Sequence, residues 1–172
     1  MLCTVISYIV LAILQYMVET EKLQEKIGEA LGLEMAAQKV VNELDSKGLL
    51  DKNGMLTQLQ KMQSQASNHQ SKLQDMVQNL ANGKIQLDTT KIKQVAEETA
   101  QKCSIMMQTY LGPDPDSSET VEFLCLAEGG EVTHYEVLAA ISRKLNSKVK
   151  NTKKLSTTIN SILKEEKRHL AL

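Results

Sequence analysis

Residues 155–172, LSTTINSILKEEKRHLAL, decide the fold because they place charged side chains in an apolar stripe. The stripe follows the steps of four and three that define one face of an α-helix, and it runs through Leu155, Ile159, Ile162, Glu166 and His169. Burying a carboxylate and an imidazole without partners is costly. This helix therefore predicts compensating groups elsewhere in the core.

The composition points to one all-α domain with a substantial core. Of the 172 residues, 42 % are hydrophobic, 24 % are charged and only 3 % are aromatic, and there are two prolines. This composition favours helices over strands. A net charge of -1 gives no electrostatic reason to expect a nucleic-acid partner. Cys3, Cys103 and Cys125 are odd in number and form no Cys-x-x-Cys motif, which favours a reducing, cytoplasmic setting.

Hydrophobic periodicity and breaker residues predict four long helices and one shorter helix in the connection between the second and third. Gly48 is placed to cap the first helix, and Asp116 with Glu119 forms a capping pair for the fourth predicted segment. A break at residues 112–118, GPDPDSS, closes the crossover. The predicted helices cover residues 17–47, 55–82, 90–110, 118–148 and 155–172. A long crossover of this kind makes the second and third long helices parallel.

Each long helix carries ionisable residues within its apolar stripe. The stripes select three carboxylates and all three histidines of the chain, namely Glu34, His69, Glu131, His134, Glu166 and His169. Glu128 and Glu165 fall outside these stripes and are expected on the surface. Glu136 lies on a different face from Glu131, where it is a substitute ligand if the helix is rotated and a solvated side chain otherwise. Gln65 lies on the flank of its stripe.

The six selected residues predict a metal site inside the bundle. Glutamate oxygens and histidine nitrogens suit iron, manganese or zinc, and a glutamate can bridge two ions. The pairs Glu131/His134 and Glu166/His169 are Glu-x-x-His motifs, which serve as half-sites in bundle proteins. One alternative is a polar core in which the same residues satisfy one another by hydrogen bonds without a metal. The other is that the register of the stripes is assigned wrongly.

The chain resembles the ferritin-like di-iron carboxylate superfamily, and within it the YciF-type, stress-associated branch. The resemblance is carried by VTHYEVLAA at residues 132–140 and LKEEKRH at residues 163–169, and more loosely by GLEMAAQKVVNEL at residues 32–44 and NHQSKL at residues 68–73. It implies a four-helix bundle formed by residues 18–172, a di-iron site and dimerisation through helix faces.

The resemblance also assigns roles to residues. Glu34, His69, Glu131 and the Glu166/His169 pair would be metal ligands, and His134 would partly replace a missing carboxylate. The departure is Ala66, which stands where the family has a metal-bridging glutamate, so that a single metal or an altered pair is the alternative to a standard di-iron site. The implied function is a metal-binding protein with an oxidative-stress or redox role. The alternative is a structural or interaction protein that keeps the fold with a degenerate site, and whether the chain is an enzyme stays open.

The apolar N-terminal extension, residues 1–17, is open to three interpretations. LCTVISYIVLAILQYM at residues 2–17 is a helix covered by the core or a partner, a membrane anchor, or a non-native segment upstream of a natural start at Met17. Sixteen residues are short for a bilayer span, and no Lys or Arg precedes them.

Overall fold

The computed structural model describes residues 2–50, 55–81, 87–146 and 153–171. These residues form the five helices α1 (Leu2–Ser46), α2 (Met55–Ala81), α3 (Thr89–Leu111), α4 (Ser117–Asn146) and α5 (Lys153–His169), and they contain no strand. The prediction of an all-α chain is therefore confirmed, but the helix between the second and third long helices is not short, since α3 has 23 residues and α5 has 17. The predicted turn at Asp51–Gly54, the break at Asn82–Gly83 and a cap at Asn151 or Thr152 fall outside the described residues.

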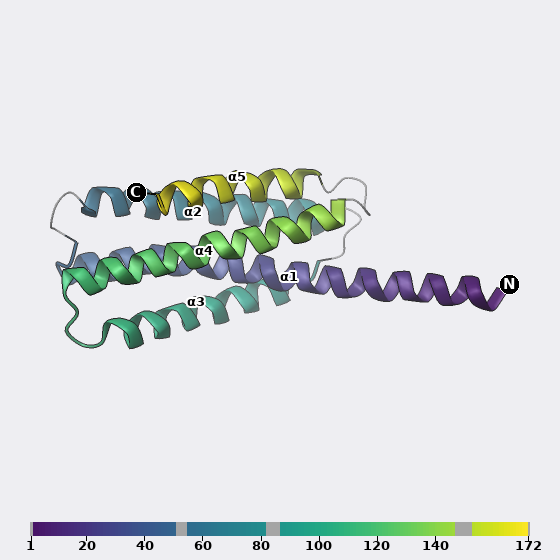
Figure 1. Cartoon of the computed structure of the whole chain (residues 1–172), viewed down its shortest axis with the longest axis horizontal. Helices are drawn as coiled ribbons and strands as arrows, with labels where there is room; N and C mark the ends of the chain where they lie inside the picture. Colours follow the sequence, from purple (N-terminus) through teal and green to yellow (C-terminus); the bar gives the residue numbers. More distant parts are fainter. Residues whose placement is uncertain (1, 51–54, 82–86, 147–152, 172) are drawn as a thin grey trace.

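The four helices α1, α2, α4 and α5 form the bundle, and α3 packs along its outside (Figure 1). Helix α2 runs antiparallel to α1, and α4 runs parallel to α2 (Figure 1). The long connection through α3 makes this order possible, because a short loop joins only antiparallel neighbours.

Helix α1 continues without interruption from Leu2, so the N-terminal extension and the first predicted helix are one element. Its first turns project beyond the other helices (Figure 1). The contacts of the side chains at residues 2–16 lie outside what the structure describes, and the three interpretations of this segment stay predictions. No helix in the described part of the chain is both long and apolar enough to cross a membrane.

The predicted helix ends are confirmed at two places. Gly48 has φ of 67°, a left-handed conformation that glycine adopts without steric cost, and its amide bonds Asp45 O at 2.8 Å. At the start of α4, Asp116 Oδ1 accepts from the amides of Ser118 and Glu119 at 2.7 and 2.9 Å, and the Glu119 carboxylate accepts from the Asp116 amide at 3.1 Å. This reciprocal pair is a capping box.

The apolar core has two layers, one on each side of a polar band. One layer joins all five helices around Leu23, Leu73, Leu138 and Ile159. The other gathers around Val40, Leu44, Leu59, Met107 and Phe123, from α1 to α4. The polar residues described next lie between these layers, in the interior of the bundle.

Candidate metal centre

Six ionisable side chains from the four bundle helices meet in the polar band. Helix α1 supplies one, α2 one, and α4 and α5 two each: Glu34, His69, Glu128, Glu131, Glu166 and His169. Glu34, His69 and Glu166 are at most 1 % exposed. These six residues are called the core cluster below.

Glu166 lies at the centre of the core cluster, between the two imidazoles. Its Oε1 lies 2.7 Å from His69 Nδ1, and its Oε2 lies 3.1 Å from His169 Nδ1. Each oxygen of one carboxylate thus faces a different histidine. The Glu-x-x-His spacing explains the second contact, because residues three apart lie on the same face of a helix.

Two overlapping groups of ligand atoms follow from this arrangement. Glu34, His69 and Glu166 form one group, and Glu128, His169 and Glu166 form the other. Within each group the ligand atoms lie within 4.8 Å of one another. Ligands bound about 2.1 Å from one ion lie roughly 3–4 Å apart, so each group has dimensions close to those of an ion's coordination shell.

The outer nitrogen of each imidazole is held by an oxygen acceptor. His69 Nε2 donates to Glu165 Oε2 at 3.0 Å, and His169 Nε2 donates to Gln65 Oε1 at 2.9 Å. A hydrogen bond at one ring nitrogen fixes which nitrogen faces a metal. Both histidines consequently direct Nδ1 into the core cluster.

Several atoms facing the centre of the cluster have no hydrogen-bond partner among the described residues. They are Glu34 Oε2, Glu128 Oε2 and His69 Nδ1. His69 Nδ1 is near two carboxylates, at 2.7 Å from Glu166 Oε1 and 3.3 Å from Glu34 Oε1, but neither contact has hydrogen-bond geometry. Buried polar atoms nearly always have a hydrogen-bond or ion partner. These three atoms therefore indicate that the cluster can accept a cation or additional protons.

Burial, and after it repulsion between neighbouring carboxylates, raises the pKa of three carboxyl groups in the core cluster. Burial, followed by repulsion from Glu166, raises the pKa of Glu128 to about 7. Burial and the charge of Glu34 raise the pKa of Glu131 well above its ordinary value, and burial also raises the pKa of Glu34. Glu166 differs because its two histidine neighbours overcome the effect of burial and lower its pKa to about 2.

The histidines respond in the opposite direction. Burial alone would lower the pKa of His69, but the Glu166 and Glu34 carboxylates raise it to about 10. The pKa of His169 is also raised, because Glu166 outweighs the effect of burial. His169 Nδ1 is hydrogen-bonded to Glu166 Oε2 at 3.1 Å, whereas His69 Nδ1 lies 2.7 Å from Glu166 Oε1 without hydrogen-bond geometry. A proton or a metal ion at either Nδ1 would offset the negative charge of the carboxylate beside it.

The structure brings together five of the six residues selected from the sequence. The exception is His134, whose Nε2 donates to Lys26 O at 2.9 Å and whose Nδ1 lies 3.4 Å from Glu29 Oε2. The prediction that His134 shares the inward face with Glu131 was wrong, because Tyr135 takes the inward position instead. The Tyr135 hydroxyl donates to Glu34 Oε1 at 2.5 Å and is completely buried.

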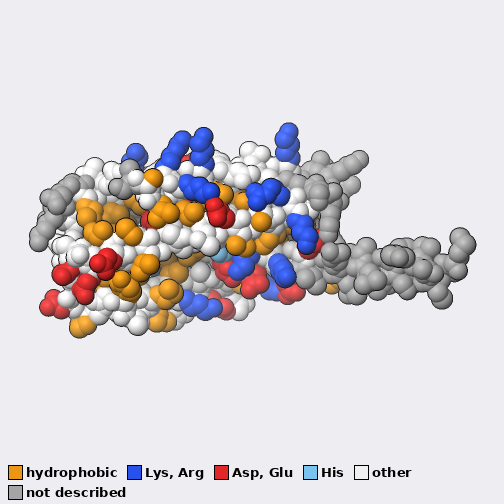
Figure 2. Space-filling view, viewed as in Figure 1, with side chains coloured by type: hydrophobic (Ala, Val, Ile, Leu, Met, Phe, Trp, Pro, Cys, Tyr) orange, Lys and Arg blue, Asp and Glu red, His pale blue; other side chains and the backbone are white. Residues whose placement is uncertain are grey.

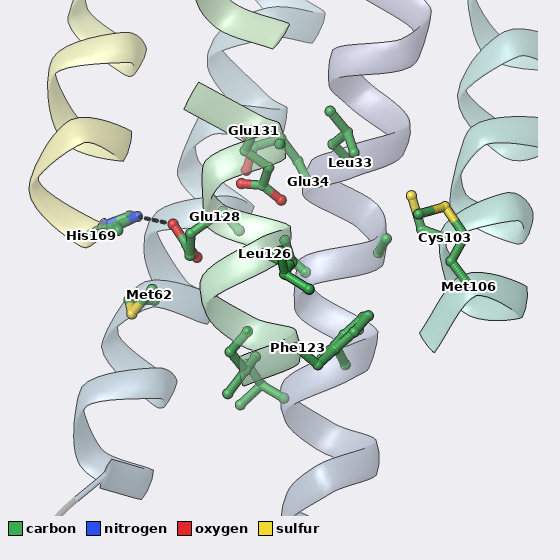
Figure 3. Close-up of a pocket in the computed structure, with 18 of the residues that line it drawn as sticks. Leu33, Glu34, Met62, Cys103, Met106, Phe123, Leu126, Glu128, Glu131 and His169 are labelled. Atoms are coloured by element: carbon green, nitrogen blue, oxygen red, sulfur yellow. Dashed lines mark ion pairs between the residues drawn. The ribbon is translucent and has the colours of Figure 1, made fainter. Parts of the chain in front are cut away.

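Glu128 and Glu165 were also misplaced by the sequence argument. Glu128 belongs to the core cluster, with Oε2 at 3.6 Å from His169 Nδ1 (Figure 3). Glu165 supports His69 and pairs with Lys72 Nζ at 3.2 Å. Glu136 is exposed and pairs with Lys167, as expected for a surface charge.

A second periodic stripe on α4 predicts the inward positions of Glu128 and Tyr135 that the first stripe missed. Glu128, Glu131, Tyr135 and Leu138 also follow steps of three and four, and this stripe contains the large aromatic side chain that the core requires. Both stripes share Glu131 and Leu138, so periodicity alone does not separate them.

No family model, curated protein or solved structure matches this chain. The case for its function therefore depends on the core cluster itself.

Proposed function

We propose that the core cluster binds two divalent transition-metal ions, with Glu166 shared between them. The observation that carries this proposal is the position of Glu166, which offers one carboxylate oxygen to each of two buried histidines. His69 and Glu34 would complete one site, and His169 and Glu128 would complete the other. Glu131 supplies a further carboxylate beside Glu34 (Figure 3).

The charge and chemistry of the core cluster fit this pair of ions. Three buried carboxylates and the partly buried Glu128 carry four negative charges when ionised, which two divalent cations balance. No lysine or arginine lies among the residues lining the adjoining pocket, so the described side chains there provide no permanent positive charge. Nitrogen and oxygen ligands on rigid helices suit iron, manganese or zinc. Glu128 and Glu131, three residues apart on α4, compensate for Ala66 on α2.

The resemblance to ferritin-like di-iron carboxylate proteins extends the proposal to redox chemistry. The parallel order of α2 and α4 supports such a bundle (Figure 1). A redox-active metal pair in this position would supply electrons for reducing dioxygen or peroxide. The chain's own residues would position the carboxylates, with Tyr135 holding Glu34 and with Glu165 and Gln65 orienting the imidazoles. Cytoplasmic location, a homodimer and a stress-related role stay predictions.

A second candidate is a structural or interaction protein with a metal-free polar core. The hydrogen bonds from Tyr135, Glu165 and Gln65 to the core cluster favour it, because they satisfy part of the cluster without a metal. Ala66 favours it as well, since this position has no carboxylate. The two candidate functions differ in whether Glu34 Oε2, Glu128 Oε2 and His69 Nδ1 bind a metal ion.

His169 and His134 provide a matched pair of variants that tests the proposal. The protein would be purified without a histidine tag, stripped with a chelator, loaded anaerobically with Fe²⁺ or with Mn²⁺, and examined by elemental analysis. We expect about two ions per chain, the loss of at least one in His169→Ala, and full retention in His134→Ala. Glu166→Gln should lose both ions, because it removes the shared ligand.

The outcome that would reject the proposal is a wild-type protein that stays metal-free after anaerobic loading. Equal metal content in His134→Ala and His169→Ala would reject the assigned ligands. Circular dichroism of each variant shows whether the helices remain, so that a folding failure is not taken for a loss of ligands.

A further inference from the structure

A pocket of about 500 Å³ leads from the protein surface to the core cluster. Its inner end is formed by Glu34, Glu128, Glu131, Glu166 and His169. Figure 3 shows the carboxyl groups of Glu34, Glu128 and Glu131 gathered beside it, with Phe123 and Leu126 on the α4 wall.

The outer part of the pocket is apolar and open between α3 and α4. Ile105, Met106 and Leu126 line it and are 54 %, 66 % and 60 % exposed. Figure 2 shows hydrophobic side chains gathered on this face of the molecule, over α3 and α4. Large exposed apolar patches mark binding sites more often than chance exposure.

The walls between the mouth and the inner end are also apolar. Leu33, Val40, Met62 and Phe123 contribute hydrocarbon and thioether surface. Among the residues that line the pocket, the charged groups are carboxylates and His169, with no lysine or arginine. In the metal-free protein the carboxyl groups at the inner end outnumber His169, so an anionic ligand meets net repulsion there when they are ionised, whereas an uncharged ligand does not.

We propose that this pocket binds a small, uncharged, largely hydrocarbon molecule and holds it against the core cluster. The volume lies within the range of roughly 300–1,000 Å³ that small-molecule sites occupy. Met62 and Met106 give the walls a deformable surface that adapts to such a ligand. As a statement about the substrate of the metal centre, this inference rests on the proposed function, but binding of the molecule itself does not require the metal.

The depth of the pocket favours a small molecule over a second copy of the chain. A helix face of a second copy would cover Ile105, Met106 and Leu126 at the mouth. It would not fill a space that reaches Glu166 and His169 in the interior. The competing explanation is that a second copy of the chain binds over the pocket mouth, and the experiment has to detect such a dimer.

Adjacent glycines on α4 offer a matched pair of variants. Gly130 lines the pocket and Gly129 does not, and a Cβ added at either position meets no atom within 4 Å. Leucine at Gly130 would therefore add its side chain at the pocket lining without a steric clash, whereas leucine at Gly129 would add one at a position outside the lining. Both substitutions raise helix propensity, so neither is expected to unfold α4.

The experiment measures fluorescence of N-phenyl-1-naphthylamine, an uncharged apolar probe, with the metal-free chain of 172 residues. Decan-1-ol and decanoate, which share chain length and differ in charge, compete for the probe at pH 8. We expect the probe to bind with wild type and Gly129→Leu, and at least about tenfold more weakly with Gly130→Leu. Decan-1-ol should displace it at least about tenfold better than decanoate.

Each other outcome overturns the inference. These outcomes are no probe binding, equal binding by the two leucine variants, or equal displacement by alcohol and carboxylate. Probe affinity that falls as protein concentration rises, with dimer formation in sedimentation, would assign the mouth to a second copy. Probe binding without metal uptake would reject the proposed function and leave the pocket as a binding site. Metal uptake without probe binding would support the proposed function and reject the pocket as a binding site for such a molecule.

Discussion

At the scale of single residues, each imidazole of the core cluster uses one ring nitrogen for a supporting hydrogen bond and the other as a proposed metal ligand. His69 and His169 use Nε2 for a hydrogen bond to a neighbouring helix and present Nδ1 to Glu166. The supporting acceptors differ in charge, because Glu165 is a carboxylate and Gln65 is a neutral amide. This difference predicts unequal metal affinities at the two halves of the core cluster.

Gln65→Leu tests the support of His169 directly. The substitution removes the acceptor for Nε2 and leaves every proposed ligand in place. Loss of such a supporting hydrogen bond typically lowers metal affinity by about 10–100-fold. Competition with a chelator of known affinity measures the change, and Gln74→Leu at an exposed position of α2 serves as the control. Unchanged affinity would show that His169 needs no orientation by Gln65.

Glu128→Gln should have opposite effects on metal binding and on metal-free stability. Burial raises the pKa of Glu128 to about 7, so its charge at pH 8 costs stability, and a neutral amide of similar size removes that cost. We expect the free energy of unfolding of the metal-free protein to rise by roughly 1–3 kcal/mol at pH 8, while metal binding at the His169 half is lost.

Glu136→Gln is the matched control for Glu128→Gln, because Glu136 lies on the same helix and is exposed beside Lys167. Its stability should stay within about 0.5 kcal/mol of wild type. Urea unfolding of both variants after chelation provides the comparison. A less stable Glu128→Gln protein at pH 8 would contradict the cost assigned to the buried charge.

At the scale of helices, α1 and α3 approach closely because two glycines lie at their contact. A Cβ added at Gly28 would lie 2.8 Å from Ile92 O, and one at Gly32 would lie 2.5 Å from Ala96 O. The facing positions on α3 include the small residues Ala96 and Ala100, both buried. This contact holds α3 beside the bundle and so shapes one wall of the pocket.

Gly32→Ala should destabilise the protein although alanine favours helices. The added methyl group meets backbone that cannot move independently of α3, and such overpacking costs about 1–3 kcal/mol. Gly129→Ala meets no atom within 4 Å and should instead increase stability by up to about 1 kcal/mol. Thermal unfolding of the two variants checks this pair, and a more stable Gly32→Ala protein would mean that α3 is not tightly packed on α1.

At the scale of the whole molecule, the ionisable core couples folding to pH. A raised carboxyl pKa, as in Glu128 and Glu131, means that the folded state holds the proton more tightly. The contribution of Glu128 to stability therefore falls as pH rises from its ordinary 4.5 toward about 7. The raised pKa of His69 acts in the same direction, with a contribution complete below 6.5 and lost as pH rises toward about 10.

Metal-free protein should therefore be more stable at about pH 5.5 than at about pH 8. His134 opposes this trend, because burial lowers its pKa and its contribution is lost below its ordinary value of 6.5. The lowered pKa of Glu166, about 2, affects stability only below 4.5. Urea unfolding at the two pH values, with chelator, measures the difference.

Loading with metal should reverse the pH trend, because ions replace protons on the ligands and bind more tightly as pH rises. The same unfolding experiment with Mn²⁺ in place of chelator provides the comparison. A metal-free protein that gains stability from pH 5.5 to 8 would contradict the assigned burial of the carboxyl groups.

The sequence by itself determined the helices and most of the core cluster. The apolar stripes led to Glu34, His69, Glu131, Glu166 and His169, because a buried ionisable residue interrupts a periodic pattern in a way that sequence alone reveals. Helix ends at Gly48 and Asp116 were equally accessible, since capping depends on residues close together in the chain.

Only the tertiary structure decided which face of α4 points inward. Stripes through His134 and through Tyr135 are both periodic, and the choice depends on how α4 rotates against α1. There the Tyr135 hydroxyl meets Glu34, and His134 meets the Lys26 carbonyl. The same rotation brings Glu128 into the core cluster and opens the pocket between α3 and α4. Packing between helices distant in sequence sets these positions, so no local pattern specifies them.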